Sequence, residues 1–285
     1  MRNLWAMLGV SALLVAATAA TAGAGLIAYE GFETYAAGTQ VESSSGVGLS
    51  GGTGWTDAWN VVDTYRTNVT VVNQSLSYTS GSVQVNGGTK AMRVTGISNT
   101  SGNFVLAGRG VPSTTGTYYL SMLFYAPTVA VDSDFIQMGF DTAWANPHVS
   151  IGQSRSSSVP AWFARAGTSS TNYAADTVVP ENTYFLVAKV SKESGSTNYN
   201  RVDLYVNPTS LTEPGTPTVS RTGTDSGISN LAYFVIREAF VETADTYYFD
   251  EIKVVDSWAG AIPEPATLAL MGLGIAGIYL GRRLR

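Results

Sequence analysis

Residues 118–125 read Tyr-Tyr-Leu-Ser-Met-Leu-Phe-Tyr, a long apolar run with aromatic residues at both ends. Such a run, bounded by turn residues, is typical of a strand that is buried on both faces. Residues 202–206 read Val-Asp-Leu-Tyr-Val, and here Val202, Leu204 and Val206 occupy alternate positions. Alternate side chains of a strand point to the same face, so these three predict one buried face. The two stretches predict a central strand over Thr117–Ala126 and a further strand over Arg201–Val206.

Short β-rich runs fill the rest of the chain between its two ends. Each is bounded by turn residues such as Asn86-Gly87-Gly88, and Ser194–Asn198 is a loop that joins an antiparallel pair. No stretch between the ends has a helix-length period of 3.6 residues. The further predicted strands are Leu26–Phe32, Trp59–Val62, Val69–Val72, Leu76–Tyr78, Lys90–Thr95, Phe104–Ala107, Phe135–Asp141, His148–Gly152, Ala161–Arg165, Tyr184–Lys192, Leu231–Arg237 and Tyr247–Val255. This pattern predicts an all-β fold, a two-sheet antiparallel jelly-roll sandwich that forms one domain over residues 25–258.

The C-terminal tail, residues 259–285, has a different composition. It contains, in order, Pro263, Glu264 and Pro265, then the apolar run Ala266–Gly281, then the basic cluster Arg282, Arg283 and Arg285. An apolar helix of this length spans about 24 Å, slightly less than a bilayer core of roughly 30 Å. Positive charge tends to remain cytoplasmic, so the arginines would stay inside and the domain before them would be exported.

This order of motif, apolar helix and arginine cluster resembles the PEP-CTERM sorting signal of Gram-negative bacteria. The resemblance implies recognition by an exosortase-type transpeptidase, cleavage near Pro263–Ala266 and only transient membrane insertion of the helix. It also implies a final location at the cell envelope surface or in the extracellular matrix. An uncleaved C-terminal anchor is the alternative. We expect Ala259–Ile262 to be a short exposed linker that leaves the cleavage site accessible.

The N-terminal end carries a second export signal over residues 1–24. Met1-Arg2-Asn3 supplies positive charge, Leu4–Ala17 an apolar core, and Ala20–Ala24 the small residues of a cleavage site. The core is too short for a stable transmembrane helix, which favours a cleaved secretory signal read by the Sec translocon. Both ends therefore predict export across the inner membrane.

The composition of the mature region limits its partners. Without the two end segments, 12 basic and 20 acidic residues remain, a net charge of −8. An acidic surface argues against nucleic acid as a partner and is compatible with divalent cations and with neutral polysaccharide. The chain has no cysteine and one histidine, which excludes disulfides and the usual zinc sites.

A second resemblance covers most of Ile27–Trp258. The order of Tyr29–Glu33 (Tyr-Glu-Gly-Phe-Glu), Gly54-Trp55, Tyr184–Val190, Val202–Pro208 and Phe249–Ile252 (Phe-Asp-Glu-Ile) is similar to that of LamG-like, concanavalin A-like jelly rolls. The family implies that the first and last strands lie side by side. It contains lectins, carbohydrate-binding modules and some glycosidases, so it does not decide the function.

Patterns for catalysis are weak in this chain. Gly46–Gly52 contains G-x-G-x-x-G and G-x-S-x-G, but in a Gly/Ser loop without the strand and helix that these motifs require. His148 stands at a predicted strand start, with no base or acid beside it in the sequence. The acids at 242, 245, 250 and 251 lack the alternate spacing of a glycosidase pair, and on a strand Asp250 and Glu251 would point to opposite faces. We therefore expect no enzyme.

The family resemblance implies a structural calcium site instead. In jelly-roll carbohydrate-binding modules, the positions that match Glu33 and Asp250 often share a calcium ion, with Glu30 as a possible third ligand. Calcium needs six to eight oxygens, so the loop Gly54–Ala58, with Asp57, would have to contribute. The alternative is that these acids are solvated or hydrogen-bonded to loops.

Four tryptophans, Trp55, Trp59, Trp144 and Trp162, lie in or beside predicted loops and could stack on a sugar ring. Core packing is the alternative for each of them. The leading functional hypothesis is a non-enzymatic surface or matrix protein with a structural or adhesive role. The alternatives are a carbohydrate-binding module that acts on exopolysaccharide and, with less support, a glycoside hydrolase.

Overall fold

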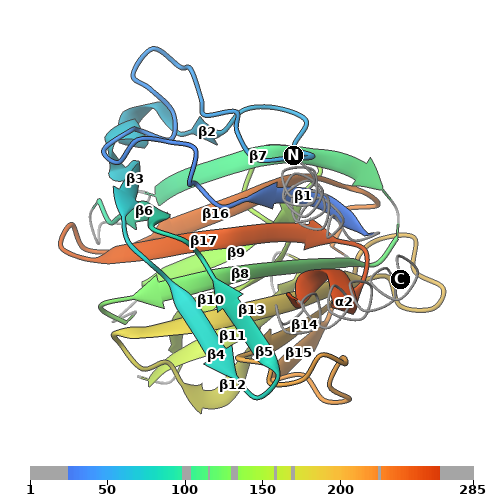
Figure 1. Cartoon of the computed structure of the whole chain (residues 1–285). Helices are drawn as coiled ribbons and strands as arrows, with labels where there is room; N and C mark the ends of the chain where they lie inside the picture. Colours follow the sequence, from blue (N-terminus) through green and yellow to red (C-terminus); the bar gives the residue numbers. More distant parts are fainter. Residues whose placement is uncertain are drawn as a thin grey trace, which may run out of the picture.

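The computed structural model describes residues 25–97, 104–114, 116–129, 134–156, 159–167, 171–223 and 226–263. These residues form two large antiparallel sheets that face each other as a sandwich (Figure 1). This confirms the predicted all-β, two-sheet fold. The predicted signal helix and the apolar helix of the tail lie outside the described residues, and within these no helix is long and apolar enough to cross a membrane.

The predicted apolar run forms β8 (Tyr118–Ala126), at the centre of the eight-stranded sheet. This strand pairs with β13 (Asn182–Ser191) on one side and with β17 (Thr246–Val255) on the other. Strand β1 pairs with β17, from Leu26 opposite Val255 to Glu30 opposite Ile252. The expectation that the first and last strands are neighbours is therefore confirmed. In spatial order the strands are β15 (Val219–Thr222), β14 (Arg201–Val206), β13 (Asn182–Ser191), β8 (Tyr118–Ala126), β17 (Thr246–Val255), β6 (Lys90–Thr95) and β3 (Val69–Asn73), with β1 (Leu26–Glu30) beside β17.

The seven-stranded sheet covers the opposite side of the core. Its central strands β9 and β16 pair antiparallel, as do β9 and β10. In spatial order the strands are β12 (Thr171–Thr177), β11 (Val159–Ala166), β10 (Val149–Ser156), β9 (Phe135–Asp141), β16 (Leu231–Ala239), β7 (Phe104–Thr114) and β2 (Asn60–Val61). A 3₁₀ helix, Asp63–Asn68, follows β2.

The core between the sheets is built from alternate side chains of each strand. Leu120, Met122 and Phe124 of β8 are buried here, as are Phe234 and Ile236 of β16. The predicted alternation in β14 is confirmed, since Val202 and Leu204 are in this core and Val206 packs against it.

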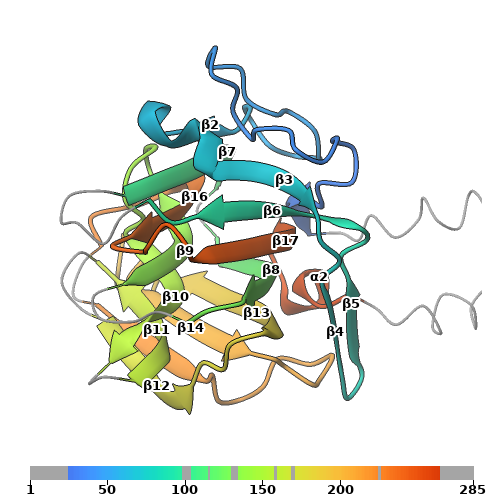
Figure 2. The ribbon, with the colours of Figure 1, turned by 90° about the vertical axis from the view of Figure 1, so that its left-hand side faces the viewer.

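The outer face of the eight-stranded sheet is covered by a second apolar layer. The hairpin β4 (Ser77–Ser80) to β5 (Val83–Asn86) and the short helix α2 (Trp258–Ala261) lie over it (Figure 2). Trp258 packs against the rings of Tyr119 and Tyr205 with centroid distances of 6.2 and 4.9 Å. The prediction that Ala259–Ile262 is an exposed linker was wrong: Ala261 and Ile262 are 0% and 3% exposed, because α2 folds them onto this layer.

Candidate functional site

The outer face of the seven-stranded sheet carries polar side chains where the eight-stranded sheet carries apolar ones. Ile136, Met138 and Phe140 of β9 point into the core, which places Gln137 on the outer side between them. Gln137 lies opposite Arg237 of the neighbouring strand β16. A hollow of about 420 Å³ opens here, lined by Gln137, Ala145, Asn146, Pro147, His148, Arg165 and Arg237. This hollow is the candidate functional site.

Two glycines lie on the same outer face of the sheet, next to the strand positions around the hollow. Gly152 of β10 lies opposite Gln137, and Gly139 of β9 lies opposite Ser150. A Cβ atom at Gly152 would be 2.8 Å from the ring of Phe163, and one at Gly139 would be 2.1 Å from the carbonyl oxygen of Val149. Side chains larger than hydrogen would not fit at either position without a shift of the neighbouring strand.

Arg237 is held flat on one side of this face by two aromatic rings. Its guanidinium carbon lies 4.6 Å from the centroid of Phe135 and 5.2 Å from that of Phe104. Burial, together with the nearby charge of Arg165, lowers the pKa of Arg237 to about 10. No carboxylate among the described residues forms a salt bridge with Arg237. A positioned cation without an anionic partner is a recognition element for an anion.

Arg165 of β11 approaches the hollow from the other side. It lies opposite Ser150 of β10, and its Nε donates a 3.0 Å hydrogen bond to the carbonyl oxygen of Gly167. Burial lowers the pKa of Arg165 as well. Two guanidinium groups therefore share one partly desolvated face of a protein whose net charge is negative.

His148 and Asp141 form a pair at the rim of the hollow. Nδ1 of His148 is hydrogen-bonded to Oδ2 of Asp141, while Asp141 Oδ1 accepts a 2.6 Å hydrogen bond from the amide of Thr142. The main chain fixes His148, whose amide donates to Phe140 and whose carbonyl accepts from Gly167. An aspartate on Nδ1 orients the ring and favours Nε2 as the acceptor nitrogen. The sequence showed no partner for His148, because Asp141 reaches it only through the β9–β10 pairing.

Three buried polar atoms on this face have no hydrogen-bond partner among the residues that the structure describes. They are Gln137 Oε1, Ser150 Oγ and Arg237 Nε. Buried polar groups in folded proteins are almost always hydrogen-bonded, so this acceptor, hydroxyl and donor can each take a further partner, a water or a ligand. The hollow can supply both hydrogen bonds and positive charge to a polar, anionic ligand.

Only one of the four predicted tryptophans lies on this face. Trp144 is 37% exposed and covers Gly108 of β7, next to the residues that line the hollow. Trp59 and Trp162 are each 1% exposed, so their prediction as stacking platforms was wrong: both rings complete the core. Trp55 is half-buried, and its Nε1 donates a 2.9 Å hydrogen bond to the carbonyl oxygen of Tyr29.

The acids predicted to bind calcium are mostly committed to other partners. Glu33 Oε1 accepts from the amides of Thr89 and Lys90, at 2.6 and 2.8 Å. Glu30 forms a buried 2.8 Å salt bridge with Arg109, and Asp57 accepts from the amide of Gly110. These bonds take up part of the hydrogen-bonding capacity of each carboxylate, and the ligand roles of Glu30 and Asp57 stay predictions.

Asp250 is the exception in this group. It is fully buried, its Oδ2 has no partner, and burial followed by the charges of Glu251, Glu33 and Glu30 raises its pKa to about 9. Asp250 thus keeps one carboxylate oxygen without a partner among the described residues. The expected strand alternation is also broken here, because the pairing of β17 with β8 shifts register between Asp250 and Lys253 and Glu251 has a φ of 52°. Calcium at Glu33 and Asp250 stays a prediction.

Comparison with known proteins identifies the tail. A family model described as the PEP-CTERM protein-sorting motif matches residues 261–285. The chain thus carries a PEP-CTERM sorting motif, which implies exosortase processing, export and a cell-surface or extracellular location in bacteria. No curated protein matches the chain in sequence.

Solved structures resemble the domain only in its β-sandwich. An alginate lyase Aly36B mutant in complex with alginate trisaccharide is 11% identical, with 81% of this chain and 97% of that chain covered and a TM-score of 0.45. The cellulose induced protein Cip1 is 17% identical over 67% and 93%, with a TM-score of 0.42. Domain 4 of AbnA, an extracellular arabinanase from Geobacillus stearothermophilus in complex with arabinotriose, is 12% identical over 84% and 98%, also with a TM-score of 0.42.

Proposed function

We propose that this chain is an exported, non-enzymatic surface or matrix protein that binds an acidic polysaccharide on the outer face of its seven-stranded sheet. The observation that carries the proposal is a set of polar atoms on this face: Gln137 Oε1, Ser150 Oγ and Arg237 Nε have no hydrogen-bond partner among the described residues. Carboxylates on a sugar chain match guanidinium groups in charge and shape. Ring hydroxyls can donate to Gln137 and either donate to or accept from Ser150.

The dimensions of the face suit a chain better than a small molecule. Arg237 and Arg165 lie on strands separated by β9 and β10, which places their backbones about 14 Å apart at the usual strand spacing. Exposed aromatic rings extend the face on both sides, Trp144 at one end and Tyr173 at the other, both more than one-third exposed. Tyr173 packs edge-on against Phe163 with a centroid distance of 6.3 Å. Aromatic rings at the ends of a polar hollow can stack on sugars flanking a central acidic unit.

Binding by the full chain to a polyuronate and to a neutral glucan tests this proposal. We expect saturable binding of the polyuronate that weakens with salt, and little binding of the glucan. R237Q and R165Q should each weaken this binding by roughly 10- to 150-fold, as loss of a hydrogen bond to a charged group does. R201Q is the matched control, because Arg201 lies on the eight-stranded sheet and pairs with Asp203 and Glu193. Equal affinity for both glycans, or equal loss in R201Q, would contradict the proposal.

The location of the protein can be tested separately in a host that encodes an exosortase. The chain without residues 263–285 should leave the envelope fraction, whereas the full chain should be found at the surface or in the matrix after cleavage. Retention of the shortened chain in the envelope would contradict sorting by the tail.

A second candidate function follows from the His148–Asp141 pair. On a uronate bound at Arg165 and Arg237, His148 could take the proton at C5, a C4=C5 double bond would form, and the C4–O bond would break with protonation of the leaving oxygen. Such β-elimination yields an unsaturated product that absorbs in the ultraviolet. Appearance of this absorbance with the wild type and its loss in H148A would replace the binding proposal by a lyase.

A further inference from the structure

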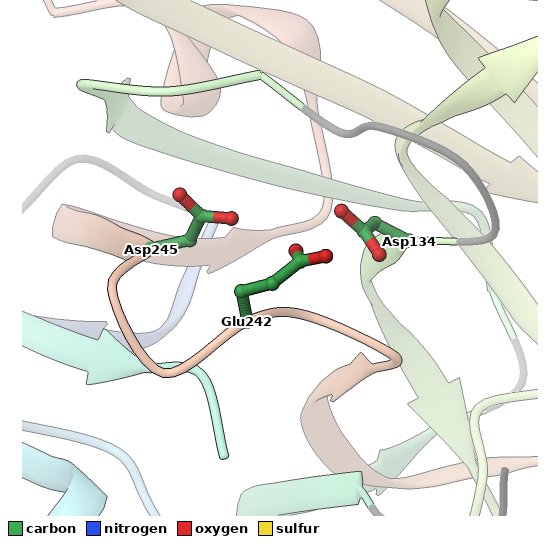
Figure 3. A group of neighbouring side chains, drawn as sticks. All are labelled: Asp134, Glu242 and Asp245. Carbon is green, nitrogen blue, oxygen red and sulfur yellow. The ribbon is translucent and has the colours of Figure 1, made fainter. Parts of the chain in front are cut away.

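Three carboxylates meet at the end of the sandwich where β16 turns into β17. Asp134 comes from the segment just before β9, Glu242 from the β16–β17 turn and Asp245 from the residue before β17. One oxygen of each lies within 4.8 Å of the others, and Figure 3 shows the three side chains reaching into one space. Asp134 is 1% exposed, and Glu242 and Asp245 are half-buried. We name this group the turn triad.

A buried phenol beneath the turn triad provides an independent observation. Tyr247 is 0% exposed, and its hydroxyl has no hydrogen-bond partner in the protein. Tyr247 follows Asp245 by two residues, and its hydroxyl is close enough to Asp134, Glu242 and Asp245 for their charges to act on it. The phenol oxygen can therefore take an additional partner near the turn triad, a bound water or an ion.

Glu238 of β16 is a fourth acid, buried in the core near the turn triad. It points into the core from β16, on the same side as Phe234 and Ile236, and is 0% exposed. Burial raises the pKa of Glu238 to about 8, against the effect of the Val105 and Val241 amides, and the charge of Asp134 acts in the same direction as burial. The three carboxylates of the turn triad, with an unpartnered phenol nearby, have the oxygen chemistry of a hard-cation site.

We propose that Asp134, Glu242 and Asp245 bind a divalent cation of the calcium type, which joins the segment before β9 to the β16–β17 turn. All three donors are hard oxygens, and carboxylates can bind calcium through one or two oxygens, with water completing the shell. The sorting motif implies export, and affinities of roughly 10⁻⁴–10⁻³ M are typical of extracellular calcium modules. The site is distinct from the pair predicted at Glu33 and Asp250.

The cation would also fix one side of the polar hollow. Phe135 follows Asp134 directly, and its ring contacts both Arg237 and Phe240. Phe240 precedes Glu242 by two residues in the same turn. Cation binding would thus hold the two segments that position the Arg237 guanidinium. This consequence rests on the proposed function, whereas the cation site itself does not.

Titration of the chelator-treated full chain with Ca²⁺, and with Tb³⁺ as a luminescent substitute, tests the site. We expect a rise in melting temperature with Ca²⁺, and Tb³⁺ luminescence on excitation of tyrosine. E242Q and D134N should weaken Ca²⁺ binding at least tenfold, as loss of a charged ligand does, whereas D250N should not change it. E242Q is the gentler variant, because Glu242 lies half-exposed in a turn.

Y247F supplies a readout that does not depend on the acidic variants folding. It keeps the ring that stacks on Phe124 and removes only the hydroxyl, so Ca²⁺ stoichiometry should stay while sensitised Tb³⁺ luminescence falls several-fold. Loss of binding in D250N with retention in E242Q and D134N would place the cation at the other acids and overturn the proposal. Absence of any Ca²⁺ effect, or luminescence unchanged in both Y247F and E242Q, would also overturn it.

Discussion

The outer faces of the two sheets differ: one is apolar and covered by other elements, and the other carries polar side chains. On the eight-stranded sheet, Tyr119, Leu123, Phe185, Val187 and Tyr205 face outward and are buried beneath the β4–β5 hairpin and α2. On the seven-stranded sheet, the corresponding outward positions hold Gln137, Ser150, Arg165 and Arg237, with two glycines between them. No helix or strand of the described chain lies against that face in Figure 2.

The difference separates stability from recognition. An apolar outer face must be covered to remove it from water, and the chain uses a hairpin and its last helix for this purpose. A polar outer face needs no apolar cover, and the hollow lined by Gln137, Arg165 and Arg237 lies on it. Substitutions on the covered face should therefore change the free energy of unfolding, and those on the open face should change binding.

The largest effect on the free energy of unfolding is expected in α2, which covers the apolar outer face of the eight-stranded sheet. Trp258 is 6% exposed and packs edge-on against Tyr119 and Tyr205, so W258A leaves a cavity and should lower the free energy of unfolding by about 3–5 kcal/mol. Urea unfolding measures this, with V47A as control, because Val47 is 68% exposed. Polyuronate affinity of the folded W258A fraction should not change. A loss below about 1 kcal/mol would show that α2 is not a structural cover.

The next effect is on binding at the open face. R237K keeps the charge but loses the planar fork that Phe104 and Phe135 hold, so it should bind polyuronate more weakly than the wild type and more tightly than R237Q. A hydrogen bond to a charged group contributes about 1.5–3 kcal/mol, which corresponds to roughly a 10- to 150-fold loss for R237Q. Calorimetric titration measures both variants. If R237Q instead lowers the free energy of unfolding as much as W258A does, Arg237 stabilises the fold. The separation between a covered face for stability and an open face for binding would then be wrong.

A smaller, pH-dependent effect is expected at Glu213, which caps polar atoms of the covered face. Lys189 Nζ and the hydroxyl of Tyr119 each donate to its carboxylate at 2.8 Å, and Tyr205 donates at 3.0 Å. Burial alone would raise the pKa of Glu213, but these hydrogen bonds outweigh it and lower the pKa below the usual value. The carboxylate therefore contributes stability above its unfolded pKa of about 4.3, and this is lost as the pH falls through the folded pKa.

E213Q tests this contribution. It should lower the free energy of unfolding by about 1 kcal/mol at neutral pH, and the difference from the wild type should shrink in acid, where Glu213 is itself protonated. Urea unfolding of E213Q and of the wild type, at neutral pH and in acid, measures this difference in the free energy of unfolding. A difference that grows in acid would contradict the assignment of the carboxylate as the stabilising form.

Much of the fold was predictable because strand period and turn residues are local signals. The predicted bounds of β6, β9 and β14 agree with the structure. Strands β5, β12 and β15 were not predicted, since they are short or lack a regular alternation and depend on neighbouring strands. The burial of Ile262 was also missed, because nothing local shows that the chain folds back after β17.

The candidate site was less predictable because it depends on register and sheet order. Asp141 meets His148 only because Phe140 pairs with Val149 in the β9–β10 hairpin. Arg165 and Arg237 share a face only because β9 and β10 lie between their strands. One local signal was available: Gln137, Gly139 and Asp141 alternate with apolar residues, which indicates a strand with one polar face.

The smallest effect is expected at the edge of the open face, at Trp144. Its ring covers Gly108 and is 37% exposed, so it contributes little to the core and is free to stack on a sugar. W144A should weaken polyuronate binding by about 0.5–1.5 kcal/mol, or two- to tenfold, and change the free energy of unfolding by less than about 0.5 kcal/mol. W144F should restore part of the affinity, because a smaller ring still stacks. If W144A binds polyuronate normally but unfolds more easily, the ring of Trp144 covers the sheet as α2 does. The outer face of the seven-stranded sheet would then be a covered face at β7, and the difference between the two sheets would not hold there.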